Sequence, residues 1–325
     1  MSKEKISFVI PCYRSANTIG GVVDEIEEVM RAEENYKHEI ILVNDGSPDD
    51  TWITISRIAT EHDHVKAFNL SKNFGQHAAL MAGLNNAKGD IVVCLDDDGQ
   101  TPADEAPKLI RGIENGADVV YARYQTKQHS LFRNMGTAMN EWMASAMLGK
   151  PKDLYVSSYF AVRKYVVREM IKYQGSYPYV IGLVLRVTRN IINVDVNHRK
   201  REIGTSGYTF ASLLSLWING FTAFSIKPLR MATMAGTIIA IGGFVYGIYT
   251  VIKKFVIPDV PLGFSAMMSA LLLIGGMLML MVGLAGEYIG RSYISMNKNP
   301  QYIIKEECKK PKNDQSSMKS MDEIN

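Results

Sequence analysis

The sequence has few cysteines and almost no excess of charge. Only three of its 325 residues are cysteines, Cys12, Cys94 and Cys308, and their spacing matches no metal-binding motif. Cys12 and Cys94 lie in apolar segments, so we expect reduced, buried thiols in a protein of the cytosol. The formal net charge of +3 is too small to indicate a nucleic-acid partner.

Two common signals are also missing. The apolar run within residues 1–11 is too short for a signal peptide. Neither of the glycine-rich phosphate loops, G-x-x-x-x-G-K-S/T and G-x-G-x-x-G, occurs, which argues against a P-loop kinase and a dinucleotide-dependent dehydrogenase. A phosphorylated ligand would therefore be bound mainly by a metal ion and by basic side chains.

Short apolar segments alternate with helical patterns through the N-terminal half. A helix capped by Asn17 is expected, and strands are expected at residues 6–10, 39–43, 65–70, 90–95 and 117–122. This alternation predicts an α/β fold with a mostly parallel sheet. Such sheets bind ligands beyond the carboxyl ends of their strands, so the polar residues that follow the strands are candidates for a site.

Polar residues do follow four of these strands. They are Tyr13, Asp45, the pair Lys72 and Asn73, and the run Asp96–Asp98. Three adjacent carboxylates repel one another, and Mg²⁺ or Mn²⁺ would relieve that repulsion while completing its shell with substrate phosphates. A strand that runs into an acidic surface turn is the alternative.

Four motifs occur in an order typical of one enzyme family. They are strand-Pro-x-Tyr at 6–13, strand-Asn-Asp-Gly-Ser at 39–47, NFGQHAALMAGL at 73–84 and LDDDGQTPADE at 95–105. Together they resemble an inverting family 2 glycosyltransferase of the GT-A fold, over about residues 5–306. Within that family the chain is similar to polyprenyl-phosphate glycosyltransferases: dolichol-phosphate mannose synthases, bactoprenol glucosyltransferases and undecaprenyl-phosphate formamido-arabinose transferases.

The resemblance implies a donor site with a divalent metal ion, Mg²⁺ or Mn²⁺. Asp45 would bond the nucleotide base, and Asp98 would be a catalytic residue that binds the metal directly. The implied nucleotide-sugar residues are Pro11, Tyr13, Asp45, Asp96 and Asp97, and the implied metal ligands are Asp96, Asp98 and Gln100. The chain departs from the family at Arg14 and Ser15, where many members have Asn-Glu.

Basic residues further along the chain are candidates for phosphate binding. Arg123 and Arg133 lie in a basic segment where the family places acceptor-phosphate arginines, and we favour that role for them. A solvated basic helix start is the alternative. The family pattern R-x-x-G-x-S-K is matched at Arg201 and Ser206, with Gly207 in place of the lysine. The resemblance implies a catalytic role for Arg201 and phosphate contacts for both residues.

No general base can be assigned in residues 154–168, which contain no Asp or Glu. Some family members carry a carboxylate there, near the position of Ser157 and Ser158. A lipid monophosphate has a second pKa near ~6, so its attacking oxygen is already ionised at neutral pH and needs no proton removal. His62 and His64 flank Asp63, and because nothing nearby completes a metal site we interpret them as a solvated helix end.

Two long uncharged segments follow the catalytic half. Residues 231–252 and 262–286 contain 22 and 25 uncharged residues, and 22 residues of helix extend about 33 Å, enough to cross a membrane. We therefore predict a GT-A domain over 1–207, a juxtamembrane amphipathic segment over 208–230 and two transmembrane helices within 231–290. A tail with a disordered end follows over 291–325. A buried core helix is the alternative for the juxtamembrane segment.

The basic residues predict the orientation of these spans. Lys227 and Arg230 precede the first span, and the connector has only Lys253 and Lys254. The second span is followed by Arg291, Lys298, Lys305, Lys309 and Lys310, among others. Both termini are therefore predicted to be cytoplasmic. The resemblance implies a multi-pass protein of the bacterial inner membrane. Glycines in both spans permit close helix contacts, and the resemblance implies a homo-oligomer, a tetramer.

These observations favour an enzyme that transfers a sugar from a nucleotide-diphosphate donor, UDP-linked, to undecaprenyl phosphate with inversion, for modification of cell-envelope glycans. A processive polysaccharide synthase is disfavoured because the chain lacks Q-x-x-R-W. A degenerate, inactive membrane scaffold and a transferase with a non-polyprenyl acceptor are the remaining alternatives. Glucose, N-acetylglucosamine and an amino-arabinose derivative all stay open as the sugar.

Overall fold

The computed structural model describes residues 3–124, 151, 153–197, 227–256, 263–296 and 299–310. The chain forms two units. The first unit comprises Met1–Ser206 together with Pro300–Asn325, and the second comprises Gly207–Asn299. The first unit is therefore built from two separate stretches of sequence.

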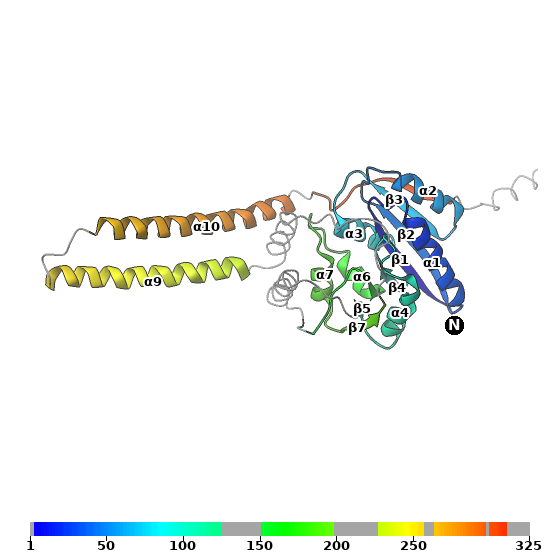
Figure 1. The fold of residues 1–325 in the computed structure, drawn as a ribbon, viewed down its shortest axis with the longest axis horizontal. Coiled ribbons are helices and arrows are strands. Elements are labelled where there is room, and N and C mark those ends of the chain that lie inside the picture. Colours follow the sequence, from blue (N-terminus) through cyan, green and yellow to red (C-terminus); the bar gives the residue numbers. More distant parts are fainter. Residues whose placement is uncertain are drawn as a thin grey trace, which may run out of the picture. The chain divides into compact units, whose positions relative to one another are not determined.

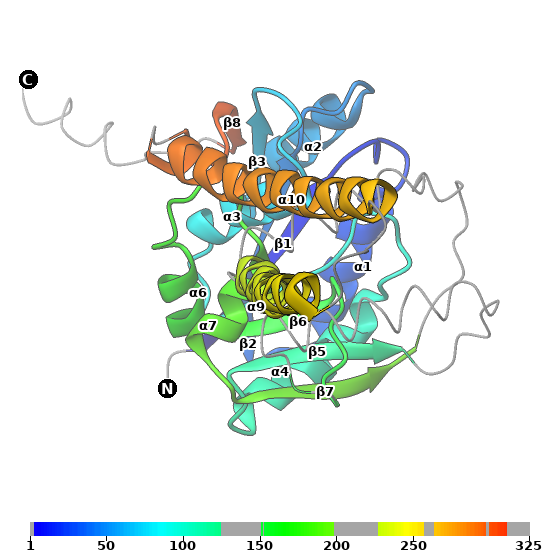
Figure 2. The same cartoon turned by 90° about the vertical axis from the view of Figure 1, so that its left-hand side faces the viewer.

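A mixed β-sheet forms the centre of the first unit (Figure 1). Its strands are β1 (Glu4–Cys12), β2 (Tyr36–Asn44), β3 (Val65–Leu70), β4 (Ile91–Cys94), β5 (Val119–Tyr124), β6 (Phe160–Arg163), β7 (Ile191–Val196) and β8 (Ile304–Lys309). Their order across the sheet is β7-β5-β6-β4-β1-β2-β3-β8. Strands β1 to β4 are mutually parallel, and β5 pairs in parallel with β7, as Figure 2 also shows. The predicted mostly parallel α/β sheet is confirmed, with β6 and β8 as antiparallel additions.

Helices cover both faces of this sheet. They are α1 (Ile19–Ala32), α2 (Thr51–Glu61), α3 (Gln76–Asn86), the 3₁₀ turn η1 (Ala103–Glu105), α4 (Ala106–Glu114), α6 (Lys164–Met170) and α7 (Val180–Val187). The prediction that Asn17 caps α1 is wrong, because the helix begins at Ile19 with Thr18 at the N-cap. The carbonyl of Ser15 accepts bonds from the amides of Thr18 and Ile19, and this turn includes Asn17.

Apolar side chains from both faces of the strands are buried. On one face, Ile6, Phe8 and Ile10 of β1 pack in a core cluster that includes residues of α1, α2 and α4. On the other face, α3 approaches so closely that a Cβ on Gly83 would lie 2.3 Å from a methyl group of Val9. Burial on both faces explains why the parallel strands appear in the sequence as continuous apolar runs rather than alternating patterns.

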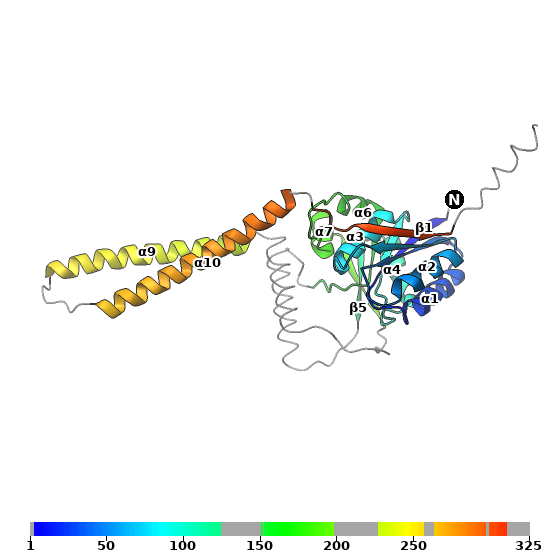
Figure 3. The same ribbon diagram turned by 90° about the horizontal axis from the view of Figure 1, so that it is seen from above.

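The last described strand joins the sheet after the second unit has been completed in sequence. Strand β8 pairs antiparallel with β3, with Phe68 opposite Glu307, and is the red strand in Figure 3. The indole Nε1 of Trp52 donates a hydrogen bond to Glu306 Oε2 at 2.9 Å, and Cys308 packs against the core. Residues 304–309, which lie within the predicted tail, thus form an edge strand of the catalytic sheet.

The second unit contains two long helices, α9 (Lys227–Val256) and α10 (Phe264–Met296), which lie side by side (Figure 1). Within the described residues, Leu273–Gly290 is long and apolar enough to cross a membrane. Large apolar side chains of α10 are exposed, for example Met279 at 80% and Val282 at 70%. This stretch overlaps the second predicted span, residues 262–286, whereas the first, residues 231–252, stays a prediction. Most of the predicted juxtamembrane segment, residues 208–226, lies outside the described residues.

Candidate active site

The loop after β1 is tied to the acidic run after β4. The amide of Tyr13 donates a hydrogen bond to Asp97 Oδ2 at 2.9 Å. The amide of Arg14 donates to Ser47 Oγ at 2.9 Å, which links the same loop to the segment after β2. Arg14 has a φ of 57°, a left-handed conformation that is uncommon outside glycine. Three strand ends therefore meet at one edge of the sheet, as the parallel arrangement predicts.

Asp45 holds the loop that precedes α3. Its side chain is buried, and its two carboxylate oxygens accept bonds from the amides of Phe74 at 2.7 Å and Gly75 at 2.9 Å. Burial raises the pKa of the Asp45 carboxyl, and the two amide bonds oppose that rise. The structure thus gives Asp45 a role in shaping this edge, and its predicted contact with a nucleotide base stays a prediction.

Gly46, next to Asp45, has a φ of +61° and lies against the backbone of the same loop. An added Cβ would lie 2.4 Å from the carbonyl carbon of Lys72 and 2.5 Å from the amide nitrogen of Asn73. We expect Gly46→Ala to lower the free energy of unfolding by about 2–4 kcal/mol, because it combines left-handed strain with a backbone clash. Urea denaturation of the purified protein measures this change.

The matched control for that substitution is Gly20→Ala in α1. A Cβ there meets nothing within 4 Å, and alanine is the better helix former, so we expect unchanged or slightly increased stability. Equal stability of the two variants would contradict the proposed crowding at Gly46.

Asp96 is held by two side chains from other elements. Its Oδ1 accepts a bond from Gln76 Nε2 at 2.9 Å, and its Oδ2 accepts a bond from the hydroxyl of Ser158. Burial raises the pKa of Asp96 to about 6; the bond from Ser158 opposes this rise, and the charges of Asp98 and Asp97 add to it. Neither partner was predicted from the sequence, although Gln76 lies within the motif at 73–84.

The acidic run Asp96–Asp98 is the predicted site of a divalent cation. Asp98 Oδ1 accepts a bond from the amide of Gln100 at 3.0 Å, and burial raises the pKa of Asp97. The three carboxylates are bonded to different donors rather than converging on one point, and the raised pKa values of Asp96 and Asp97 reflect burial together with mutual repulsion. Mg²⁺ is usually bound by one or two carboxylates and completed by phosphate oxygens, which matches Asp98 with Asp96 beside it.

The predicted acceptor residues fall only partly within the described chain. Arg123, in β5, forms an ion pair with Asp195 of β7, with 2.5 Å between Nε and Oδ1, and its side chain is 50% exposed. Its guanidinium is thus partly neutralised, and phosphate binding by Arg123 stays a prediction. Arg133, Arg201 and Ser206 lie outside the described residues.

Protein-family models match both halves of this chain. A family model described as glycosyl transferase family 2 matches residues 7–171, and one described as a GtrB C-terminal hairpin matches residues 227–292. The chain is 32% identical to an undecaprenyl-phosphate 4-deoxy-4-formamido-L-arabinose transferase of Proteus mirabilis, covering 96% of this chain and 97% of that protein. The enzyme of the same name from Klebsiella pneumoniae is 30% identical, with 95% of each chain covered.

A solved structure shares the fold. It is the glucosyl-3-phosphoglycerate synthase of Mycobacterium tuberculosis in complex with Mn²⁺ and uridine-diphosphate-glucose. The TM-score is 0.50 at 20% identity, and the match covers 68% of this chain and 79% of that one. The first unit therefore has the GT-A fold, and the chain is a glycosyltransferase that belongs to glycosyl transferase family 2.

Proposed function

We propose that this enzyme transfers one sugar from a UDP-linked donor to the phosphate of undecaprenyl phosphate, with inversion at the anomeric carbon. The observation that carries the proposal is the acidic edge of the sheet, where Asp96 and Asp98 suit a cation bound to a diphosphate. Relatives named as undecaprenyl-phosphate sugar transferases, aligned over nearly the whole chain, support the choice of acceptor.

On the donor side, the chain supplies a base pocket and a carboxylate pair. Pro11 and Tyr13 line the proposed base pocket beside Asp45. The hydrogen bonds that Asp45 accepts from the amides of Phe74 and Gly75 fix the loop before α3. Asp98, with Asp96 and Gln100, would bind Mg²⁺ or Mn²⁺, which supplies positive charge to stabilise the departing diphosphate.

On the acceptor side, the reaction needs orientation more than proton removal. The hydroxyl of Ser158 donates a hydrogen bond to Asp96, and residues 154–168 contain no carboxylate that could act as a general base. Because the acceptor phosphate arrives ionised, Arg123, Arg133, Arg201 and Ser206 act by positioning it for attack opposite the leaving diphosphate. Such an attack inverts the anomeric carbon.

The chain connectivity supports an even number of membrane crossings. Strands β3 and β8 pair in one sheet, so the segments before α9 and after α10 both belong to the same folded unit. A hairpin of two spans returns the chain to the side from which it left, and the excess of Lys and Arg outside the connector favours the cytoplasm for that side. Nucleotide-sugar donors are made in the same compartment.

The test uses the purified full chain in detergent with undecaprenyl phosphate, Mg²⁺ or Mn²⁺, and a panel of labelled nucleotide-sugars. We expect label from one donor to enter the organic-extractable lipid, and a chelator to stop this transfer because the diphosphate loses its counter-charge. Undecaprenol without phosphate is the matched control acceptor and should receive no label.

The other outcomes separate the alternatives. Metal-dependent binding of a nucleotide-sugar without labelling of the lipid would indicate that the acceptor is a protein or a glycan. Failure to bind any nucleotide-sugar would overturn the proposal in favour of a degenerate scaffold.

A further inference from the structure

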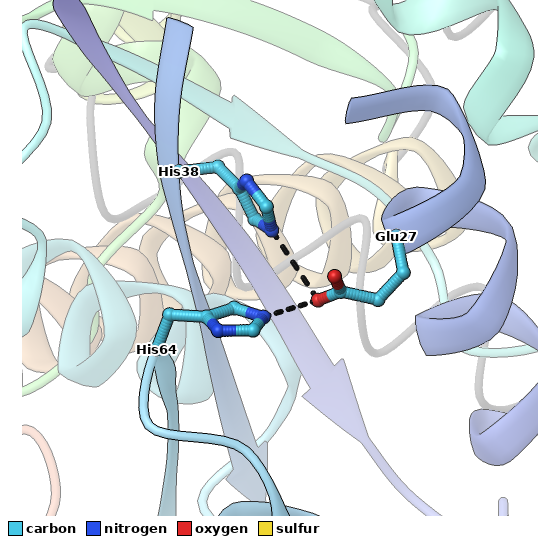
Figure 4. Close-up of side chains that lie close together, drawn as sticks. All are labelled: Glu27, His38 and His64. Atoms are coloured by element: carbon cyan, nitrogen blue, oxygen red, sulfur yellow. Dashed lines mark hydrogen bonds and ion pairs between the residues drawn. The ribbon is translucent and has the colours of Figure 1, made fainter. Parts of the chain in front are cut away.

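A second group of metal-binding side chains lies apart from the acidic run. The interpretation of His64 as part of a solvated helix end is wrong, because His64 is half-buried and hydrogen-bonded to Glu27 (Figure 4). His38 Nε2 lies 3.3 Å from the same Glu27 oxygen, Oε1. The side chains of Glu27, His38 and His64 are only 18%, 17% and 32% exposed. We refer to these three residues as the His–Glu–His cluster.

The His–Glu–His cluster lies at the opposite end of the strands from the candidate active site. His38 lies near the start of β2, whereas Asp45 directly follows the end of that strand. Because a strand rises about 3.3 Å per residue, the two positions are separated by about 20 Å. His64 likewise comes immediately before the first residue of β3. A ligand of this cluster would therefore not be part of the donor site.

The donor atoms have the chemistry and spacing of a transition-metal site. Two imidazole nitrogens and one carboxylate oxygen all lie within 4.8 Å of one another. Zinc binds such ligands at about 2.0–2.1 Å, and tetrahedral geometry then separates ligand atoms by about 3.3 Å. The distance of 3.3 Å between Glu27 Oε1 and His38 Nε2 already equals this separation. His64 Nε2 lies closer to Glu27 Oε1, and a small movement of His64 would bring this pair to the same separation.

Burial lowers the pKa of His38, although the bond to Glu27 opposes this shift. Burial alone would raise the pKa of Glu27, but the bonds from His64 and His38 outweigh it and keep the carboxylate ionised. The exposed neighbour Asp63 is paired with Lys310 at 2.9 Å, so it competes little for the same ion.

We propose that Glu27, His38 and His64 form a binding site for a zinc-class divalent ion, with water as the fourth ligand. The ion would join α1 to β2 and to the connection between α2 and β3, three segments that are distant in sequence. The site stabilises the GT-A domain and takes no part in sugar transfer. This proposal does not depend on the identity of donor or acceptor.

The first test follows Co²⁺ as a spectroscopic substitute for zinc. The full chain in detergent is freed of metal by chelation and titrated with Co²⁺. We expect the intense visible absorption of tetrahedral Co²⁺ at one equivalent, displaced by Zn²⁺, whereas an oxygen-rich octahedral site at Asp98 absorbs only weakly. Glu27→Gln and His64→Gln should lose the intense bands.

Two controls keep the result specific. Glu28→Gln changes an exposed neighbour on α1 and should retain the bands, as should Asp98→Asn. Bands that survive in both cluster variants, that disappear in Asp98→Asn, or that never form in the wild type would overturn the proposal. The last result would leave a hydrogen-bonded His–Glu–His network without metal.

Thermal unfolding gives a second readout that needs no cobalt. Zn²⁺ at a hundredfold excess over its dissociation constant should raise the unfolding midpoint of the wild type and of Glu28→Gln by about 5 °C. The midpoint of His38→Gln should not move with Zn²⁺, whatever its stability without metal. An equal rise in that variant would contradict the assignment.

Discussion

Replacing Asp98 by asparagine is expected to lower the rate of sugar transfer by about 10³-fold, the size of loss seen when a charge-stabilising group is removed from a site of this kind. Asparagine retains the size of the side chain and an oxygen that can accept the bond from the Gln100 amide. What it removes is one negative charge from the ligand set that we propose for the divalent ion. The loss should therefore appear in kcat and in the metal requirement, with folding unaffected.

The measurement is the initial rate of lipid labelling as a function of Mn²⁺ concentration. Asp24→Asn, an exposed carboxylate of α1, is the matched control and should be as active as the wild type. Full activity of Asp98→Asn at ordinary Mn²⁺ concentrations would remove Asp98 from the metal site and leave Asp96 as its main carboxylate ligand.

A large effect on stability is also expected from a change at Glu39 in β2. Its buried carboxylate accepts bonds from Ser7 Oγ and the Lys88 amide, both at 2.7 Å, and pairs with Lys5 at 2.8 Å and Lys66 at 2.9 Å. We expect Glu39→Gln to lower the free energy of unfolding by about 3 kcal/mol, at the lower end for a broken buried ion pair. The two lysines are partly exposed and recover some hydration, which limits the loss.

The same carboxylate makes stability depend on pH. Burial alone would raise the pKa of Glu39, but the bonds from Lys5, Ser7, Lys66 and Lys88 outweigh it and lower the pKa to about 2. A lowered pKa in the folded state stabilises the protein above the ordinary glutamate pKa of about 4.3, and this contribution is lost as the pH falls towards 2. Urea denaturation between pH 7 and pH 3 should show this loss in the wild type and a weaker one in Glu39→Gln.

Glu307→Gln is the control for the stability measurement. Glu307 pairs with Lys309 at 3.1 Å, but both side chains are well exposed, so we expect a change within about 0.5 kcal/mol. A similar small change in Glu39→Gln would mean that water reaches the buried carboxylate in the folded protein.

The alternation of strands and helices up to residue 124 could be predicted because β1, β2, β4 and β5 each contain a run of four or more apolar residues. The two antiparallel strands gave no such signal. Strand β6 has only four residues, and β8, with the sequence IKEECK, is mostly polar and exposed. Their positions depend on pairing with β4, β5 and β3, which contacts distant in sequence determine.

The candidate active site, like the sheet, could be predicted only in part from the sequence. The run Asp96–Asp98 stands out because adjacent carboxylates need a cation, but the partners of Asp96 lie 20 and 62 residues away, at Gln76 and Ser158. The His–Glu–His cluster was not predictable from local pattern. Glu27 is 11 residues from His38 and 37 from His64, and only the packing of α1 on β2 and β3 brings them together.

The pairing of β8 with β3 has a consequence for biosynthesis. Ribosomes release β3 long before β8, and the whole helical hairpin is made between them. During that interval the outer edge of β3 is an unpaired strand edge, which other chains can bind. The GT-A sheet can be completed only after α10 has left the ribosome. Folding of the catalytic unit therefore depends on how far synthesis of the α9–α10 hairpin has progressed.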